Sequence, residues 1–413
     1  MNTRTFETVT VVGLGYIGLP TAAVLASAGV RVHGMDVSPR TVEAISSGAV
    51  PFVEPGLAEY VEEAVRAGRL TASHTVEPAD AYVLAVPTPF HEDRSPDLTY
   101  VVAATESIAP TVAAGSLVVL ESTSPPGTTE LVARRLSELR PDLVTDGALD
   151  VHVAHCPERV LPGYVMKEIV SNDRVVGGLT PAAAEAARDL YRLFCVGEIL
   201  LTDATTAEMA KLVENSFRDV NIAFANELSL ICDKLGVDVW ELIELANHHP
   251  RVNILRPGPG VGGHCIAVDP WFIVAADPEG SRLIRTAREV NDSKPEWVLD
   301  KVAGAIEGVE APVVAALGLA FKPNIDDLRE SPARRIVAEL ADRHPGATVR
   351  VVEPHVEALP AELANRRNVE LTDLARAIDG ADCVVVLVAH DAFTGTELAG
   401  ASGHVLDTTG LLA

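Results

Sequence analysis

One cysteine of this chain stands where a nucleophile would be useful. Between Arg251 and Cys265 lie four glycines and two prolines. A glycine-rich backbone can wrap closely around a ligand, and a thiol at its end is suited to covalent catalysis. We therefore predict that Cys265 is a nucleophile, whereas Cys383, inside an apolar run, and Cys232, late in a helical stretch, are expected to be buried. The histidines of this segment match no usual zinc spacing, so no metal site is predicted.

A second group of polar residues shares one face of a long predicted helix. Lys211 and Asn215 are four residues apart and Arg218 follows three residues later, so their side chains point the same way. A cation here would lower the pKa of a nearby thiol and could stabilise an oxyanion. Charged faces are often only solvated, and that alternative stays open for these three residues.

Gly13, Gly15 and Gly18 form a G-x-G-x-x-G segment that follows an apolar strand and opens a helix. In this setting the glycines permit a tight turn, close approach of a pyrophosphate and close packing of the helix. Asp36 ends the next strand, where its carboxylate would accept hydrogen bonds from the ribose hydroxyls and repel a 2′-phosphate. The pattern predicts NAD as the cofactor, and Arg40 is the one nearby residue that would suit NADP.

Further candidates follow other predicted strands, namely Thr88, Thr123 and the pair Glu158 and Arg159. Ligands of parallel sheets bind beyond the carboxyl ends of the strands. For the two threonines an ordinary turn is an equally good explanation. The charged pair has no obvious structural role directly after a buried strand, which favours a functional interpretation.

The elements that would position these residues are two α/β regions around a helical middle. In the first region, near-continuous apolar strands alternate with helices, which predicts a parallel sheet covered on both faces. The expected strands are 9–12, 30–36, 81–86, 117–121 and 151–155, and the expected helices are 17–28, 56–67, 99–112 and 128–139.

The middle begins with a helix of about thirty residues, because no proline or glycine interrupts the chain between a capping box at Thr205 and Gly236. Helical patterning then continues to Ala305, apart from a loop over 248–269, and the βα alternation returns with Ser331 as an expected helix N-cap. We therefore predict two Rossmann-like doubly wound parallel-sheet domains, 1–203 and 306–413, joined by a helical domain, 204–305. The sequences do not settle whether the two α/β regions are structural repeats.

Composition excludes several classes of protein. The 413 residues carry a net charge of −25, which argues against nucleic acid and anionic membranes as partners. No apolar run approaches the ~20 residues of a spanning helix. The polar first residues suggest no secretory signal, and an odd number of scattered cysteines suggests no disulfide framework. A cytoplasmic protein is expected.

Several long stretches resemble the UDP-glucose/GDP-mannose dehydrogenase family of nucleotide-sugar dehydrogenases, over nearly the whole chain. The stretches that carry the resemblance are GLGYIGLPTAA, ESTSPPGTTE, CPERVLPG, ENSFRDVNIAFANELSLICDKLG, HPRVNILRPGPGVGGHCIAVDPWFIV and LAFKPNIDDLRESPA. The resemblance implies an NAD-dependent, four-electron oxidation of the sugar C6 alcohol to a carboxylate, in a homodimer or higher homo-oligomer.

The resemblance also implies roles for individual residues. Cys265 would be the nucleophile, Lys211 a general acid/base or oxyanion stabiliser with Asn215 beside it, and Asp269 and Glu158 would match the family's acidic residues. NAD would be held by Tyr16, Ile17, Asp36, Thr88, Thr123 and Arg329, in addition to the glycines. The UDP-sugar would contact Arg159, Val160, Lys211, Asn215, Arg218, His249, Arg251, Gly262 and Lys322. Arg251 and its loop would reach the site of a neighbouring subunit.

Two departures bear on the substrate. Pro162 stands where UDP-glucose enzymes of the family carry a second glutamate, and His264 precedes the cysteine in place of the usual serine. Both point towards a 2-acetamido sugar, with UDP-N-acetylmannosamine as the leading expectation and UDP-N-acetylglucosamine or UDP-glucose as alternatives. A two-electron hydroxy-acid dehydrogenase and a non-catalytic NAD-binding protein are the competing classes.

Overall fold

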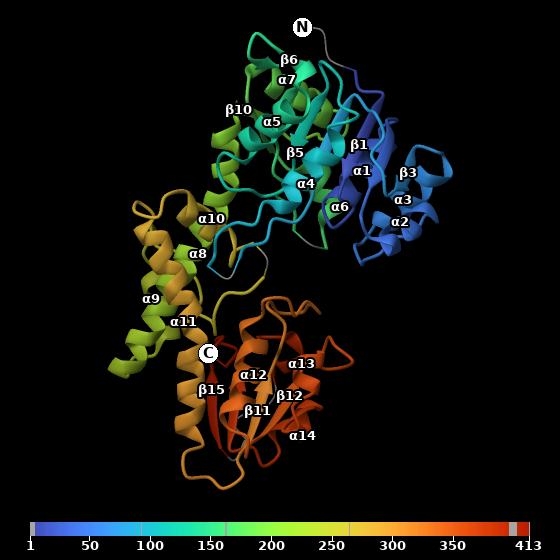
Figure 1. The fold of residues 1–413 in the computed structure, drawn as a ribbon. Helices are drawn as coiled ribbons and strands as arrows, with labels where there is room; N and C mark the ends of the chain where they lie inside the picture. The colour runs from blue at the N-terminus through green and yellow to red at the C-terminus, as the bar shows by residue number, and fades with distance from the viewer. Residues whose placement is uncertain (1–4, 92, 162, 264, 396–402, 413) are drawn as a thin grey trace. The chain divides into compact units, whose positions relative to one another are not determined.

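The computed structural model describes residues 5–91, 93–161, 163–263, 265–395 and 403–412. The chain forms two compact units, the first made of residues 1–214 and 271–277 and the second of 215–270 and 278–413 (Figure 1). Helix α8 (Ala204–Leu235) begins in the first unit and continues in the second. The expected middle domain is thus shared between the units, and the three-domain division stays a prediction.

The first unit is built on a sheet of eight strands among the described residues, in the order β10-β9-β8-β5-β4-β1-β2-β3. The strands are β1 (Thr8–Val12), β2 (Arg31–Met35), β3 (Leu70–Ser73), β4 (Ala81–Leu84), β5 (Leu117–Leu120), β8 (His152–His155), β9 (Arg174–Gly178) and β10 (Ile199–Asp203). Neighbouring strands are parallel except β8 and β9, which pair antiparallel. The five strands expected from the sequence, β1, β2, β4, β5 and β8, pair parallel as predicted, and the antiparallel pair involves β9, which was not expected.

Helices cover both faces of this sheet. On one face Val11 and Val83 pack with residues of α1, α3 and α7, and on the other Tyr82 and Leu84 pack with residues of α4 and α5. This two-sided burial explains the near-continuous apolar strands. The helices of this unit are α1 (Gly18–Ser27), α2 (Pro39–Ser46), α3 (Leu57–Arg66), α4 (Thr99–Ile108), α5 (Thr128–Leu139), α6 (Val165–Ser171) and α7 (Pro181–Tyr191). Helix α10 (Asp269–Ala276) begins in the second unit and belongs to the first from Trp271 onwards. A 3₁₀ turn (Pro141–Leu143) and a small ribbon, β6 (Val144–Thr145) with β7 (Ala148–Leu149), complete the unit.

The second unit contains a smaller parallel sheet in the order β13-β12-β11-β14-β15. Its strands are β11 (Val313–Leu317), β12 (Thr348–Val352), β13 (Val369–Leu371), β14 (Cys383–Val386) and β15 (His404–Asp407). Ala316 packs towards α11 and α12 on one face, and Ala315 packs towards α14 on the other. Besides α8, the helical elements are α9 (Val239–Asn247), α11 (Arg282–Ala305), α12 (Pro332–Arg343), α13 (Ala361–Ala364), α14 (Leu374–Ile378) and a 3₁₀ turn (Asp391–Phe393). Ser331 caps α12 by accepting from the backbone N–H of Arg334, as expected.

The two α/β regions are structural repeats, a question that the sequence left open. Five strands of each sheet follow the same order, β3-β2-β1-β4-β5 in the first and β13-β12-β11-β14-β15 in the second. After the first strand of each repeat a glycine adopts a left-handed backbone, Gly13 at φ 91° and Gly318 at φ 96°. Each glycine N–H donates to the carbonyl that ends the neighbouring strand, Met35 or Val352, at 2.8 Å in both cases.

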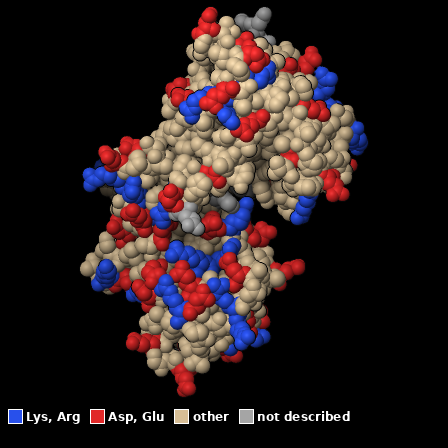
Figure 2. Space-filling view, viewed as in Figure 1, with Lys and Arg blue, Asp and Glu red and all other residues tan. Residues whose placement is uncertain are grey.

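The surface carries charges of both signs. Acidic and basic side chains are interspersed over the face shown in Figure 2, and the whole chain has 58 acidic and 33 basic residues. Within the described ranges, no helix has the length and apolar character needed to cross a membrane.

Candidate active site

The glycine segment after β1 has the geometry of a dinucleotide-binding turn. A Cβ at Gly13 would collide with the carbonyl oxygen of Ala85, and a Cβ at Gly18 would collide with the carbonyl oxygen of Gly13. At Gly15, in contrast, a Cβ would meet no atom within 4 Å, so the backbone is open where a pyrophosphate would approach. Gly13 and Gly18 are thus required by close backbone contacts, whereas Gly15 leaves room for a ligand, and the residues present fit NAD.

The Asp36 carboxylate is oriented so that it can accept hydrogen bonds from ribose hydroxyls. One carboxylate oxygen accepts from the backbone N–H of Leu14 and the other from that of Ser38, each at 2.8 Å. Each oxygen keeps lone pairs for further donors, and the side chain is only half-buried. The remaining cofactor candidates of the first unit lie near the same sheet edge. Tyr16 stacks on Phe52 with ring centroids 4.3 Å apart.

The loops after β4 and β5 are joined by hydrogen bonds. The Thr88 hydroxyl donates to the carbonyl of Thr123 at 2.5 Å, and Ser122 accepts from the N–H of Val86 at 2.9 Å.

Ile17 is the N-cap of α1. Arg329, the other cofactor candidate, belongs to the second unit, where it pairs with Asp327 at 2.6 Å.

The charged pair after β8 has a structural role that the sequence did not suggest. Glu158 is buried and forms an ion pair with buried Arg174 at 2.9 Å, and Arg159 pairs with Glu214 of α8 at 2.6 Å. The argument that this pair lacks a structural function was therefore wrong. Arg174 was missed, although an arginine at the start of an apolar run was the available signal.

A second buried carboxyl group lies beside this ion pair. Glu121 ends the β5 region and accepts from the hydroxyls of Tyr191, at 2.9 Å, and Thr21, at 3.1 Å. Burial, together with the negative charge of Glu158, raises the pKa of Glu121 to about 7. This carboxyl group therefore gains and loses its proton near neutral pH.

The predicted nucleophile is exposed at the start of a short turn in the second unit. The carbonyl of Cys265 accepts from the N–H of Asp269 at 2.9 Å, and Asp269 then begins α10. The buried Asp269 carboxylate accepts from the Asn215 amide of α8 at 2.5 Å. The structure thus brings Cys265, Asp269 and Asn215 together, and Lys211 lies one turn before Asn215 on the same helix.

The glycines before the cysteine are required by close packing. A Cβ at Gly262 would lie 2.5 Å from the carbonyl oxygen of Glu330 and 2.7 Å from Cδ of Pro332. Gly263, at φ 84°, packs on the ring of Phe321. The segment therefore passes directly against the loop that joins β11 to α12.

A buried polar network ties the same segment to the long helix. Asn226 of α8 accepts from the N–H of Gly258 at 2.9 Å and donates to Asn291 of α11 at 2.8 Å. Asn291 donates in turn to Asp219, which forms a buried ion pair with Arg288 at 2.6 Å. The partner of Asn226 on α11 could not be identified from the sequence.

The other substrate candidates lie in different environments. Arg218, His249, Arg251 and Lys322 are exposed, whereas Val160 and Lys211 are half-buried. Pro162 and His264, on which the substrate expectation depends, lie outside the described residues. The other cysteines are buried free thiols: Cys156, Cys195, Cys232 and Cys383. Burial raises the pKa of Cys156 to about 12 and that of Cys383 to about 11, which makes neither thiol a good nucleophile at neutral pH.

Comparison with known proteins assigns the family. Residues 7–195 match the NAD binding domain of the UDP-glucose/GDP-mannose dehydrogenase family, 205–293 its central domain and 315–413 its UDP binding domain. The chain belongs to this family. It is an NAD-dependent nucleotide-sugar dehydrogenase, as the resemblance implied.

Relatives of high identity extend over almost the full chain. An NDP-N-acetyl-D-galactosaminuronic acid dehydrogenase of Ralstonia solanacearum is 57% identical over 98% of this chain and 96% of its own length. A UDP-N-acetyl-D-mannosamine dehydrogenase of Escherichia coli (strain K12) is 56% identical over 94% of each chain. Among solved structures, the UDP-D-ManNAc dehydrogenase of Pyrococcus horikoshii superimposes with a TM-score of 0.86 at 38% identity, covering 98% of this chain and 96% of its own.

Proposed function

We propose that this dehydrogenase oxidises the C6 hydroxyl of UDP-N-acetyl-D-mannosamine to the carboxylate in two steps. The observation that carries the proposal is the exposed thiol of Cys265 beside the hydrogen-bonded pair Asp269 and Asn215. A two-electron dehydrogenase needs no such thiol. A four-electron enzyme does, because the aldehyde formed first must be retained for the second oxidation.

The balanced reaction is R–CH₂OH + H₂O + 2 NAD⁺ → R–COO⁻ + 2 NADH + 3 H⁺. NAD supplies the hydride acceptor for each oxidation. Cys265 Sγ forms a bond to the aldehyde carbon, and the resulting thiohemiacetal is oxidised to a thioester. Water then attacks the carbonyl carbon, the C–S bond breaks and the Cys265 thiol is released.

The residues around the thiol are suited to charge that develops on the C6 oxygen. One amide hydrogen of Asn215 is held by Asp269, which leaves the other to donate to that oxygen. Lys211 Nζ, one turn earlier on α8, is the second donor and the group that exchanges a proton with the C6 hydroxyl. Glu158, anchored by Arg174, is the further carboxylate that can accept a proton from the hydrolytic water.

Cofactor binding is assigned to the first unit. We propose that the pyrophosphate lies on the turn that includes Gly15 and that Asp36 accepts from the ribose hydroxyls. The substrate contacts proposed by resemblance are Arg159, Val160, Lys211, Asn215, Arg218, His249, Arg251, Gly262 and Lys322. The free thiols fit a reducing compartment, and we place the enzyme in the cytoplasm.

The enzyme is proposed to be a homodimer that pairs through α8. Phe217, Phe224, Ile231 and Leu235 are 69%, 52%, 47% and 72% exposed, and their spacing puts them on one face of the helix. Large exposed apolar side chains that share one helix face mark an interaction surface, and the same face of a second copy can pack against it about a two-fold axis. Light scattering should give a dimer for the wild type and a monomer for Phe217→Glu/Phe224→Glu. Leu283→Glu, which changes another exposed leucine, on α11, is the matched control and should remain dimeric.

The test of the function is product stoichiometry combined with a substrate screen. UDP-N-acetylmannosamine should yield two NADH and one uronate per sugar, with a higher kcat/KM than UDP-N-acetylglucosamine or UDP-glucose. The screen should include UDP-N-acetylgalactosamine, because one relative is an NDP-N-acetyl-D-galactosaminuronic acid dehydrogenase. One NADH with a released aldehyde or ketone would contradict the four-electron reaction, and a higher kcat/KM for another sugar would contradict only the substrate.

A further inference from the structure

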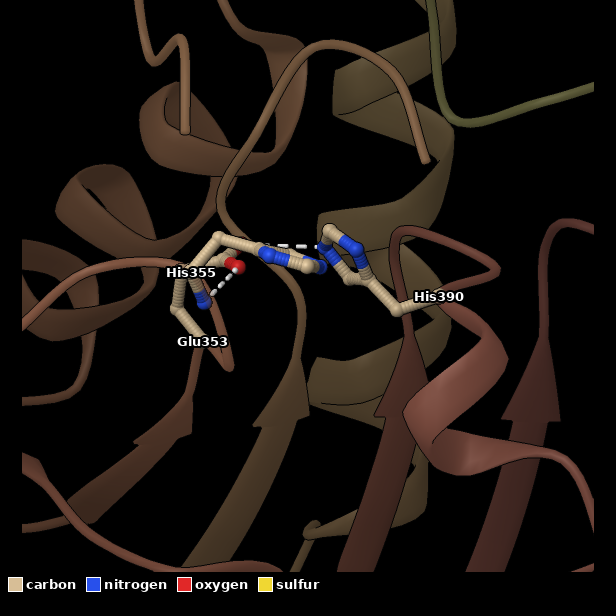
Figure 3. Close-up of side chains that lie close together, drawn as sticks. All are labelled: Glu353, His355 and His390. Carbon is tan, nitrogen blue, oxygen red and sulfur yellow. Dashed lines mark hydrogen bonds and ion pairs between the residues drawn. The ribbon is translucent and has the colours of Figure 1, made fainter. Parts of the chain in front are cut away.

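A cluster of titratable side chains lies at the carboxyl edge of the second sheet, apart from the residues discussed so far. Glu353 follows β12, His355 stands two residues later and His390 follows β14 (Figure 3). Candidate ligand atoms of the three side chains all lie within 4.8 Å of one another. Glu353 and His390 are buried and His355 is exposed. The cluster could bind a metal ion, or its side chains could be hydrogen-bonded within the protein.

The hydrogen bonds of His390 argue against a metal ion. The backbone N–H of Asn324 donates to His390 Nδ1 at 2.9 Å. A neutral imidazole that accepts at Nδ1 carries its proton on Nε2, and this nitrogen lies 3.1 Å from Glu353 Oε2, to which it donates. A metal ion at Nε2 would need the lone pair that this proton occupies. The two residues therefore form a histidine–carboxylate pair with a fixed tautomer.

Glu353 connects this pair to the turn after β11. Its Oε2 also accepts from the backbone N–H groups of Leu319, at 2.7 Å, and Ala320, at 3.0 Å. Its Oε1 accepts from the N–H of His355 at 3.1 Å. One buried carboxylate thus fixes the start of the loop that leads from β11 to α12.

The same loop is fixed again at its centre. Asn324 adopts a left-handed backbone at φ 61°, donates its N–H to His390 and accepts from the N–H of Asp391 at 3.0 Å. The loop then closes on itself, since the N–H of Phe321 donates to the carbonyl of Asp327 at 3.2 Å. Its two ends, at Phe321 and Glu330, are the groups against which the glycines before Cys265 pack.

We propose that Glu353 and His390 are positioning residues of the dehydrogenase. Acting through Asn324, they hold the loop 319–330, which carries Lys322 and supports the glycine segment of the nucleophile. Neither is proposed to touch substrate. The kinetic part of this inference rests on the proposed function, whereas its structural part does not.

The central variant is His390→Ala, which removes both hydrogen bonds of the ring. Amide hydrogen exchange of a peptide covering 319–330 should become at least about tenfold faster. The KM for the nucleotide sugar should rise about tenfold while kcat changes less than about twofold, because substrate binding is weakened more than chemistry. His390→Asn should restore both values towards the wild type, since Asn Oδ1 stands as many bonds from Cα as His Nδ1 and can accept from Asn324.

The matched control is Asn368→Ala. The Asn368 amide donates to the carbonyls of Ala341 and His344 just before β13, at the amino edge of the same sheet. This variant should lower the Tm but leave the loop exchange and KM unchanged. If His390→Ala does not fold, His390→Phe replaces it, because the phenyl ring fills the place of the imidazole but makes neither of its hydrogen bonds.

The proposal is overturned if loop exchange and KM stay at wild-type values in His390→Ala, or in His390→Phe where that variant replaces it. It is also overturned if His390→Asn behaves like His390→Ala, or if Asn368→Ala shifts KM equally. Zinc chloride should not raise the wild-type Tm, and a rise that disappears in His390→Ala would mean a metal site instead. If the wild type oxidises no UDP sugar, the proposed function fails while the exchange measurement still decides the positioning role.

Discussion

Replacing Glu121 by glutamine should make the free energy of unfolding less sensitive to pH. Glu121 is buried between Tyr191 and Thr21, and burial, with the charge of Glu158, raises its pKa to about 7 from an ordinary value of 4.5. Because the folded state binds this proton more tightly, its stabilising effect is complete below pH 4.5. That effect is lost as the pH rises towards 7.

The size of the effect follows from the displacement of the pKa. A difference of about 2.5 pH units corresponds to about 3 kcal/mol, of which about 1 kcal/mol is lost at pH 5.5 and nearly all at pH 8. Glutamine is neutral at both pH values, and the two hydroxyl partners can each donate or accept, so the amide can keep both hydrogen bonds. Relative to the wild type, Glu121→Gln should therefore gain about 2 kcal/mol between pH 5.5 and pH 8.

Urea unfolding followed by far-UV circular dichroism at the two pH values measures this difference. Glu54→Gln is the control, because Glu54 is also buried but accepts from two backbone N–H groups, Gly163 and Val165, through separate oxygens. An amide cannot accept at both positions, so this variant should be less stable than the wild type at both pH values. Parallel stabilities of wild type and Glu121→Gln across the two pH values would refute the buried, proton-sharing role of Glu121.

Three further predictions concern the nucleophile, its glycine segment and the buried ion pair between α8 and α11. Cys265→Ser should form the first NADH but lose the second, as stopped-flow absorbance would show, whereas Cys383→Ser should turn over almost normally; equal losses would remove the distinction between the two thiols. Gly262→Ala should fold but have a kcat at least about tenfold lower, because the alanine Cβ collides with the Glu330 carbonyl. Gly304→Ala, at a position of α11 where a Cβ meets no atom, is the control and should leave kcat unchanged. Arg288→Ala should cost about 3–5 kcal/mol in denaturant unfolding, because it leaves the buried Asp219 carboxylate without its cation, and a loss below 1 kcal/mol would contradict that account.

Periodicity was sufficient to predict the elements that are long or buried on both faces. The helix α8 spans Ala204–Leu235, close to the segment expected between Thr205 and Gly236, and the five expected strands of the first region are all present. The strands β3, β9 and β10 were not expected. β9 contains an arginine and two glycines, and the glycines are needed because α7 and α8 approach them too closely for a Cβ. Such tertiary requirements leave no periodic signal.

The candidate site, like the fold, could be predicted only in part from the sequence. Local motifs were sufficient to propose Asp36 and Cys265, since their surroundings in sequence carry the chemistry. Contacts between distant segments were not predictable, such as the ion pair of Glu158 with Arg174 or the hydrogen bond from Gly258 to Asn226. Buried partners of this kind depend on which faces of two elements meet, and the sequence of either element alone does not specify that.

The two repeats show why an acidic residue after the second strand does not by itself identify a dinucleotide site. In the first repeat Asp36 accepts from Leu14 and Ser38, and in the second Glu353 accepts in the same pattern from Leu319 and His355. In both, the carboxylate first serves to hold the turn that follows the left-handed glycine. The two repeats differ in the backbone and carboxylate groups that remain available to a ligand. Gly15 leaves open backbone in the first repeat, whereas the second has Ala320 at the corresponding position, and His390 supplies a further donor to its carboxylate. The same backbone device thus suits a dinucleotide in one half of the chain and fixes a loop in the other.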